Sequence, residues 1–367
     1  MSEHLQFPDL DAFYETFEAN GWGDGLPLQP PTPAGVEAFI AASGKLGDTV
    51  LGSVPPSRQP ATVEKVAVNA IMAGCRAEYM PVLVTALEAT LEPRLNCYSL
   101  QTTTHPAALM TLVSGPVAAD LQINGGTGAF GPGFRANATI GRAMRLVLLN
   151  LGGGRPGVGD LATQGSPAKY TYCFAENEED CPWEPYRVTV GFGLADSVVT
   201  VAPLEGPYNI NDHASYTGSQ LLTTIVGAIS HAGTNLLYCG GSDPFLFLGP
   251  EHAGLLAKDK LERRDIQEFV FKNARVDRDR LGSGQFDYLR QRHKVNERYE
   301  ELGLGDPGLR SIPLFSKPDD LNIVVVGGPG KHSAFASTMS RTRSVTKAIE
   351  RRAGRGSAGS VSTGGTT

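Results

Sequence analysis

An α/β fold is what the 367-residue sequence predicts: mixed sheets with helices, an arrangement that leaves room for two quasi-repeated α/β halves. Glycine (44) and proline (25) are abundant, which is typical of many tight turns and excludes a coiled coil or a helical bundle. Segments with apolar residues at helical spacing alternate with short β-branched runs. Three of these runs end in Gly-Pro, at 115–116, 249–250 and 328–329, so equivalent strand ends are expected to meet at one crevice.

Residues 1–60 are predicted to form an N-terminal helix and a proline-rich extended arm. Leu10, Phe13 and Phe17 lie at helical spacing, so a helix is expected over 9–20. The arm leads to Thr32 and Pro33, which are a typical N-cap and first helical residue for a second helix through 42.

The first α/β half is expected over residues 61–186 and the second over 187–350. In the first half the patterns predict helices from Thr62 to Gly74, over 81–91 and over 139–151, with strands at 109–113 and 121–123. In the second half they predict strands over 187–202 and at 236–238, 245–248 and 322–326, with helices at 220–229, 262–273 and 343–352. Residues 351–367 are rich in Gly, Ser and Thr and are predicted to be a disordered tail.

Composition narrows the range of partners. The net charge of -6 argues against non-specific nucleic-acid binding. No apolar run approaches the ~18 residues that a membrane span requires, and no secretory signal opens the chain, so a cytoplasmic location is expected. The five cysteines include no C-x-x-C pair, which argues against a disulfide framework or a structural zinc site. The composition leaves open whether the chain forms a homo-oligomer.

The densest candidate site is the glycine-rich segment that runs into the helix expected over 139–151. Its glycines allow backbone N–H groups to approach an anion, and arginine side chains supply two-pronged donors to a carboxylate or phosphate. Residues 126–131 match G-x-G-x-x-G, but no acidic residue follows in the ribose-binding position, so a dinucleotide fold is rejected and no cofactor is expected. The candidate substrate-binding residues here are Asn124, Gly126, Gly128, Arg135, Asn137 and Arg142.

A second glycine-rich loop occupies 327–330. Val325 and His332 stand where a phosphate-binding P-loop needs Gly and Ser or Thr, so that motif fails. Lys331 still suits an anionic substrate, and His332 suits acid–base catalysis near neutral pH.

Cysteine and histidine residues supply the remaining catalytic candidates. Cys75 precedes Arg76, whose charge favours a thiolate, although a helix end disfavours one. His105 precedes an expected strand and His252 lies at an expected helix start, so both are candidates for proton transfer. No H-x-x-x-H pair is present, and no metal is expected.

Several segments together resemble a poorly characterised bacterial family, the domain associated with proteins that carry a selenocysteine/cysteine-Gly-Ser-Cys (UGSC) motif. They read GWGDGLP at 21–27, MAGCRAEYMP at 72–81, LGPEHA at 248–253 and GGPGKHS at 327–333, together with the helix start at 137–142. The tetrapeptide itself is absent, and Cys239-Gly240-Gly241-Ser242 is only a distant echo of it. The resemblance implies a small-molecule enzyme.

The sequence therefore predicts a lyase or hydrolase acting on a small anionic organic substrate, with Cys75, His105, His252 and His332 as catalytic candidates. Two alternatives stay open. One is a thiol redox enzyme using Cys75 and Cys239, and the other is a non-catalytic ligand-binding protein.

Overall fold

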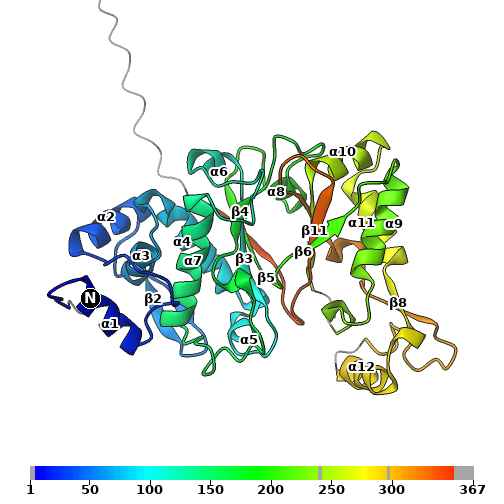
Figure 1. Cartoon of the computed structure of the whole chain (residues 1–367), viewed down its shortest axis with the longest axis horizontal. Helices are drawn as coiled ribbons and strands as arrows, with labels where there is room; N and C mark the ends of the chain where they lie inside the picture. Colours follow the sequence, from blue (N-terminus) through cyan, green and yellow to red (C-terminus); the bar gives the residue numbers. More distant parts are fainter. Residues whose placement is uncertain (1–4, 239–241, 296–297, 351–367) are drawn as a thin grey trace, which may run out of the picture.

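The computed structural model describes residues 5–238, 242–295 and 298–350, and it shows two four-stranded sheets packed face to face between two layers of helices (Figure 1). The first sheet has the order β12-β5-β3-β4 and the second the order β10-β7-β11-β6. Each sheet contains both parallel and antiparallel pairs, so the predicted α/β fold with mixed sheets is confirmed. The strands of the two sheets are β3 (Ala108–Ser114), β4 (Cys173–Ala175), β5 (Val198–Leu204), β6 (Tyr208–Asn211), β7 (Phe245–Leu248), β10 (Asn322–Val325), β11 (His332–Ala336) and β12 (Val345–Ala348).

Buried apolar side chains fill the spaces between these layers in three main clusters. One apolar cluster joins helices α3 (Val63–Met72), α4 (Met80–Thr90) and α7 (Arg135–Asn150) to the outer face of the first sheet. A second cluster joins the four helices α9 to α12, which lie within residues 218–295, to the outer face of the second sheet. A third cluster lies between the two sheets and contains Phe174, Phe245 and Phe247, all of them buried. Burying large side chains on both faces of each sheet supplies the main favourable free energy of folding.

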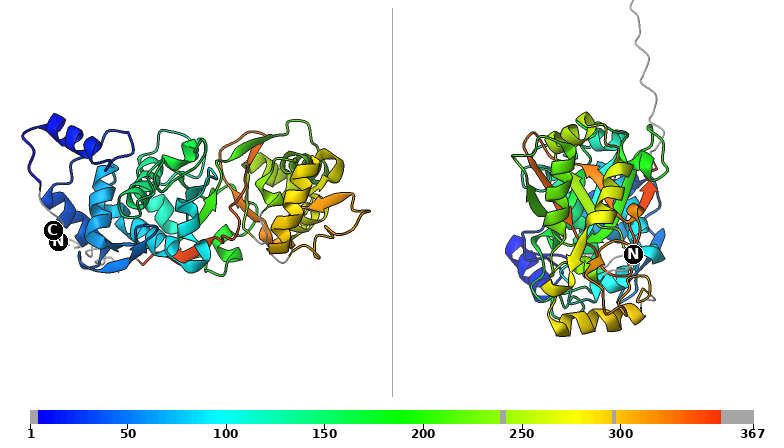
Figure 2. Two further views of the ribbon diagram at one scale, coloured as in Figure 1. Left: turned by 90° about the horizontal axis from the view of Figure 1, so that it is seen from below. Right: turned by 90° about the vertical axis from the view of Figure 1, so that its right-hand side faces the viewer.

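Helices of the first layer start where the sequence places their caps. Asp9, Thr32 and Thr62 each accept a backbone N–H at the beginning of α1, α2 and α3. The left view in Figure 2 shows that the blue N-terminal helices lie at one end of an elongated molecule. The helices of this part are α1 (Leu10–Ala19), α2 (Pro33–Ser43), α3 (Val63–Met72), α4 (Met80–Thr90), α5 (Cys97–Gln101), α6 (Pro116–Asp120) and α7 (Arg135–Asn150).

The second layer of helices lies at the other end, with two small antiparallel pairs outside the main sheets. One pair, β1 with β2, follows α2, and the other, β8 with β9, adjoins α11 and α12. Among the described residues no helix is both long and apolar enough to cross a membrane. The remaining elements are α8 (Tyr186–Thr189), α9 (Gly218–Ile229), α10 (Pro250–Lys258), α11 (Arg263–Asn273), α12 (Ser283–Val295), β1 (Val50–Val54), β2 (Gln59–Thr62), β8 (Arg275–Asp277) and β9 (Ser311–Pro313).

Each sheet receives one edge strand from the chain segment that follows a strand of the other sheet. β3 pairs in parallel with β4 and antiparallel with β5, and β5 pairs antiparallel with β12. β7 has the same relation to β10 and β11, and β11 pairs antiparallel with β6. The chain crosses between the sheets after β5 and again after β11, so each sheet is completed by a strand that follows the other sheet's central strands (Figure 1). The sequence quasi-repeat and the domain boundaries stay predictions.

Four local predictions are wrong. Residues 187–197 were expected in strands, but they form most of α8 and the turns after it, and β5 begins only at Val198. Residues 121–123 form a turn after α6, and 236–238 fall in a 3₁₀ turn over Asn235–Leu237 instead of a strand. Residues 345–348, expected in a helix, form β12, because backbone pairing with β5 outweighs the local helical preference. Helix α7 begins at Arg135, four residues earlier than expected, whereas β6, β11 and α12 were not predicted. The predicted tail, 351–367, lies outside the described residues.

Candidate functional site

Three histidines and a lysine gather where β6 ends and β11 begins, beside the start of α10. We call this group the histidine corner and define it by His213, His252, Lys331 and His332. His332 is the first residue of β11 and pairs with Asn211, the last residue of β6. The approach is tight, because a Cβ added at Gly249 would lie 2.1 Å from the carbonyl oxygen of His332. Only glycine therefore lets the end of β7 pass so near β11.

The exposed pair of this corner has a defined hydrogen-bond direction. The Nε2 atoms of His213 and His332 lie 3.3 Å apart, and Nδ1 of His332 lies 3.1 Å from Oδ1 of Asn209. Because an amide oxygen only accepts, His332 carries its hydrogen on Nδ1 and donates it to Asn209. Its Nε2 is then a bare acceptor, and Nε2–H of His213 donates to it.

His252 is buried behind this pair. The hydroxyl of Ser333 accepts from the N–H of Gly249 at 3.2 Å and donates to Nδ1 of His252 at 2.7 Å. Nε2–H of His252 donates to the backbone oxygen of Asp212 at 3.1 Å. Burial lowers the pKa of His252, and the Asp212 contacts offset this only in part, so the neutral ring is favoured. His252 acts as a positioning residue that joins α10, β11 and the end of β6.

The segment that follows β6 is held by its own acidic residue. The carboxylate of Asp212 accepts from the N–H groups of Ala214 and Ser215 and from the Ser215 hydroxyl. Burial of Asp212 favours its neutral form, but hydrogen bonds from Thr224 and Ser215 outweigh it and hold the pKa below its usual range. Lys331 donates from Nζ to the backbone oxygen of His213 at 3.1 Å. These contacts fix the backbone that presents His213.

The two glycine-rich loops meet. The expectation that the Gly-Pro strand ends at 115–116, 249–250 and 328–329 share one crevice is a separate one and stays a prediction. The N–H of Gly327 donates to the oxygen of Gly125 at 2.8 Å, and a Cβ at Gly328 would lie 1.8 Å from Oγ1 of Thr127. The first loop is closed by asparagines, since Asn137 accepts from the N–H of Asn124 at 2.8 Å and donates back to its oxygen at 2.9 Å.

The side chains of the first loop are thus used within the loop. Oδ1 of Asn124 accepts from the N–H of Gly126 at 2.9 Å, and Gly128 has a φ of +74°, which favours glycine. Asn124, Gly126, Gly128 and Asn137 therefore shape the loop, and only Asn124 also lines an open cavity.

That cavity is an open hollow of about 500 Å³ beside the start of α7. We call it the arginine hollow, because Arg76 and Arg135 line it together with Tyr79, Gln122, Ile123, Asn124, Gly133, Phe134 and Ala136. Arg135 donates from Nε and Nη2 to the oxygen of Gly74, each at 3.0 Å. The volume of the arginine hollow falls in the range of small-molecule sites.

Arg142 does not face a ligand. Its Nε and Nη2 donate to the Asp24 carboxylate at 2.7 and 2.8 Å, and Nη2 also reaches the oxygens of Leu26 and Pro27. The carboxyl side chain of Asp24 is only 5% exposed. Arg142 therefore fastens the segment after α1 to α7.

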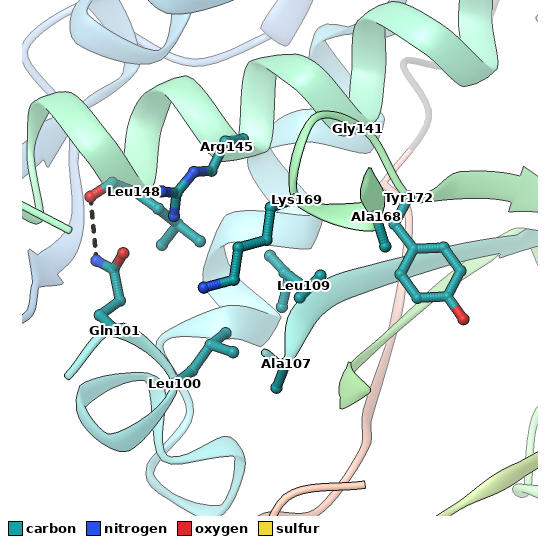
Figure 3. Close-up of a pocket in the computed structure, with 11 residues that line it drawn as sticks. Leu100, Gln101, Ala107, Leu109, Gly141, Arg145, Leu148, Ala168, Lys169 and Tyr172 are labelled. Carbon is teal, nitrogen blue, oxygen red and sulfur yellow. Dashed lines mark hydrogen bonds between the residues drawn. The ribbon is translucent and has the colours of Figure 1, made fainter. Parts of the chain in front are cut away.

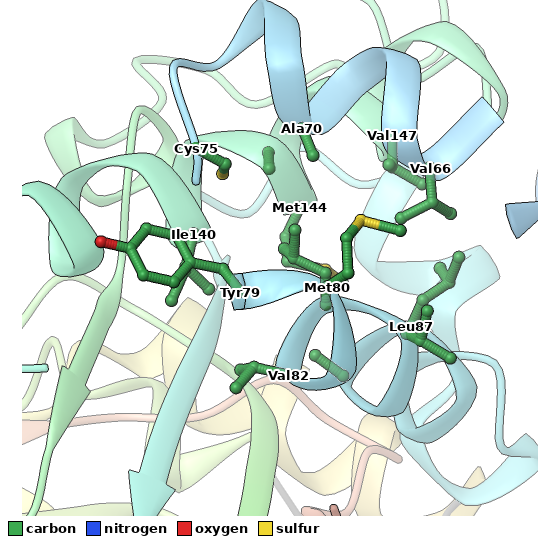
Figure 4. Close-up of a cluster of buried hydrophobic side chains, with 14 of the residues drawn as sticks. Val66, Ala70, Cys75, Tyr79, Met80, Val82, Leu87, Ile140, Met144 and Val147 are labelled. Atoms are coloured by element: carbon green, nitrogen blue, oxygen red, sulfur yellow. The ribbon is translucent and has the colours of Figure 1, made fainter. Parts of the chain in front are cut away.

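Cys75 lies inside the first apolar core, among Ala70, Tyr79 and Ile140 (Figure 4). Its thiol donates to the oxygen of Thr139 at 3.2 Å. Burial raises the pKa of Cys75 to about 12, although Arg135 and Arg142 act in the opposite direction. The thiol is therefore protonated at neutral pH and ill placed for nucleophilic attack. Cys239, its proposed redox partner, lies outside the described residues.

His105 lies away from the histidine corner. It lies before β3 in the first sheet, and its Nε2 is 2.6 Å from Oε1 of Glu205, which follows β5. The structure thus brings together His252, Lys331 and His332, joins the two glycine-rich loops, and leaves Cys75, His105 and Arg142 in separate settings. His213 was not among the predicted site residues, because Asn211-Asp212-His213 shares no motif with the segments that carry His252 and His332.

Sequence reasoning also missed a small enclosed cavity beside α7 (Figure 3). Its volume of about 20 Å³ suits a single water. Two of the residues that line this cavity, Lys169 and Arg145, form ion pairs with Asp160 at 2.6 Å and 3.3 Å. Gln101 donates to the oxygens of Pro55 and Leu148. These residues are distant in sequence and share no motif, so no sequence signal marks them.

Among the described residues no group of three or more His, Cys, Asp and Glu side chains is arranged to hold a metal. No protein family and no curated protein matches this sequence. The resemblance to the UGSC-associated family therefore stays a prediction.

Proposed function

We propose that this chain is a cytoplasmic small-molecule enzyme of the lyase or hydrolase type that acts on a small anionic organic substrate at the histidine corner. The observation that carries the proposal is the pair of exposed imidazoles whose Nε2 atoms lie 3.3 Å apart. A side chain that transfers a proton needs both access to solvent and an oriented ring, and His332 has both, because Asn209 fixes its tautomer.

The charges around the pair suit an anion. Lys331 lies next to His332 in sequence, and its Nζ is held at the backbone of His213. The carboxylate of Asp212 is turned to its own loop, where it accepts three hydrogen bonds. A substrate carboxylate or phosphate would meet Lys331 and two imidazoles there, with the exposed carboxylate of Glu251 at the start of α10 as the opposing charge nearby.

In this proposal His332 is the base, because its bare Nε2 accepts a proton from the substrate or from a water. His213 donates the hydrogen that it otherwise shares with His332, and so acts as the acid. His252 keeps β11 and α10 in register through Ser333. Cys75 takes no part in the reaction.

The test is a turnover assay with a panel of small anions, including malate, citrate, phosphoenolpyruvate and p-nitrophenyl phosphate. For any compound turned over, His332→Gln and His213→Gln are expected to lower kcat/KM about 10²- to 10⁴-fold, the range for a general acid or base. His231→Gln is the matched control, since His231 is exposed and outside the corner. Unchanged turnover in both corner variants would reject the proposal.

The arginine hollow favours a second candidate, the non-catalytic ligand-binding protein. Its lining includes two arginines and no histidine. In that case phosphate or malate would bind with an affinity that Arg76→Gln lowers, and neither corner variant would change the affinity. Turnover of none of the panel, together with that pattern, would favour this candidate over the enzyme.

A further inference from the structure

We propose that His213 and His332 together bind one divalent transition-metal ion of the zinc class, through their Nε2 atoms, on the exposed face of the histidine corner. The inference goes beyond the proposed function, because it concerns the binding of an ion and does not require a reaction. It uses two of the same side chains, so the experiments below separate the two claims.

The first argument is the distance between the two nitrogens. Zinc binds imidazole nitrogen at about 2.0–2.1 Å in tetrahedral geometry, which places two such nitrogens about 3.3–3.4 Å apart. The Nε2 atoms of His213 and His332 are 3.3 Å apart. The ion can therefore enter between them without a change in the separation of the rings.

The second argument is the direction of the rings. Two imidazoles that point their nitrogens straight at each other over 3.3 Å would have centroids about 5.6 Å apart, whereas two rings on one tetrahedral ion would have them about 5.2 Å apart. The observed centroid separation is 5.1 Å, with an interplanar angle of 79°. The observed separation therefore matches the one that two rings on a shared tetrahedral ion would have.

The third argument is the partner behind the ring. Histidines that bind metals almost always donate their other ring N–H to a carbonyl, carboxylate or water, which fixes the free lone pair toward the ion. Nδ1 of His332 donates to the side-chain oxygen of Asn209 at 3.1 Å in this way. When the ion binds, His213 moves its hydrogen from Nε2 to Nδ1, so two neutral rings hold the ion and no net proton is released.

The protein supplies two ligands. Because no third His, Cys, Asp or Glu of the described chain joins them, water or a substrate oxygen fills the remaining positions. With two protein ligands the site is open and exchangeable, unlike a closed structural site, which has four protein ligands. The ligand class that fits is a small carboxylate, held by the ion and by Lys331.

The test is calorimetric titration of the full chain with zinc chloride alone. One equivalent is expected to bind, and His213→Asn and His332→Asn are each expected to weaken that binding at least tenfold. His231→Asn, the exposed control, is expected to bind as the wild type does. Equal zinc affinity in the wild type and in both corner variants would overturn the inference.

Asn209 gives a second, independent variant. Asn209→Ala is expected to weaken zinc binding about 10- to 100-fold, as loss of a supporting hydrogen bond does, and Asn209→Asp is expected to restore it. A wild-type affinity in Asn209→Ala would overturn the role assigned to His332. Zinc binding without turnover of any panel compound would reject only the proposed function, whereas turnover that is lost in the corner variants without any zinc binding would reject only this inference.

Discussion

Two corners of the molecule have similar strand-to-helix turns but differ in the side chains that face them. In the first sheet β3 ends at Ser114, and Gly115-Pro116 begins α6; in the second sheet β7 ends at Leu248, and Gly249-Pro250 begins α10. A serine of the neighbouring strand region accepts a backbone N–H at each helix start, Ser197 in the first sheet and Ser333 in the second. The two corners therefore share a strand end, a Gly-Pro helix start and a serine acceptor, although Gly115 has a φ of +94° and Gly249 a φ of −66°.

The difference lies in what faces these helix starts. At the first corner the chain supplies its own carboxylate, since Glu178 accepts from the N–H of Gly115 at 2.7 Å and pairs with the buried Arg187. We call this the closed corner. The histidine corner instead leaves His213 and His332 exposed. The closed corner thus pairs its carboxylate within the protein, although Nε of Arg187 is buried without a hydrogen-bond partner, whereas the histidine corner keeps its two imidazoles available for a ligand.

The largest effect expected from this contrast concerns thiol reactivity in the first half. With a pKa of about 12, Cys75 is expected to react with iodoacetamide at pH 7 at least about a thousandfold more slowly than a free cysteine, because the thiolate is the reacting form. Peptide mass spectrometry of the native chain over a time course would measure this. Cys181, which is only half-buried, is the internal comparison. Labelling of Cys75 as fast as Cys181 would return the thiol to the list of catalytic candidates.

The second effect is a pH dependence that comes from Glu176, behind the closed corner. Burial raises the pKa of Glu176 to about 7, against the hydrogen bond from the N–H of Tyr186 and the charge of Arg263. The unfolded chain releases this proton near pH 4.5 and the folded chain near pH 7, so this contribution to stability is full below pH 4.5 and is lost as the pH rises through 7. The loss amounts to about 3 kcal/mol.

Urea denaturation at several pH values would measure that dependence. Glu176→Gln is expected to flatten the change in free energy of unfolding between pH 5 and 8, because glutamine does not titrate. Glu179→Gln, at an exposed position nearby, is the matched control and is expected to leave the slope unchanged. An equal slope in wild type and Glu176→Gln would show that Glu176 is ionised in the folded chain throughout.

The fold was more predictable than the site, for a physical reason. The helices α1, α2, α3 and α11 carry their caps or their apolar spacing within a single segment, and each was predicted to within about two residues. β12 was predicted as a helix, because its partner β5 lies about 150 residues away in the chain, and only that partner makes it a strand.

The site shows the same limit more strongly. The residue types were suggestive at His252, Lys331 and His332, since a lysine and histidines beside glycine turns can be recognised locally. Their meeting with His213 depends on β6 crossing into the second sheet, which no local pattern reveals. Cys75 and Arg142 look reactive in sequence. In the structure the Cys75 thiol is buried and donates to the oxygen of Thr139, and Arg142 is paired with the Asp24 carboxylate.

The third prediction tests the closed corner directly. Glu178→Gln removes the charge that faces Arg187, whose side chain is only 4% exposed. Because Glu178 itself is partly exposed, the expected loss is about 2 kcal/mol, below the range for a fully buried pair. Urea denaturation at pH 7 would measure it, with Glu179→Gln as control. Equal stability of the two variants would remove the distinction between the corners.

The smallest effect is expected at the histidine corner. His332 is exposed, and its ring bonds are made to other exposed side chains, so His332→Asn is expected to change the free energy of unfolding by less than about 0.5 kcal/mol. Parallel urea titrations of His332→Asn and His231→Asn would measure this. A loss as large as that of Glu178→Gln would mean that His332 holds β11 in place, and the corner would then be a structural feature like its counterpart. A small loss keeps the contrast: the corner that costs least to alter in stability is the one whose side chains remain free to act on a ligand.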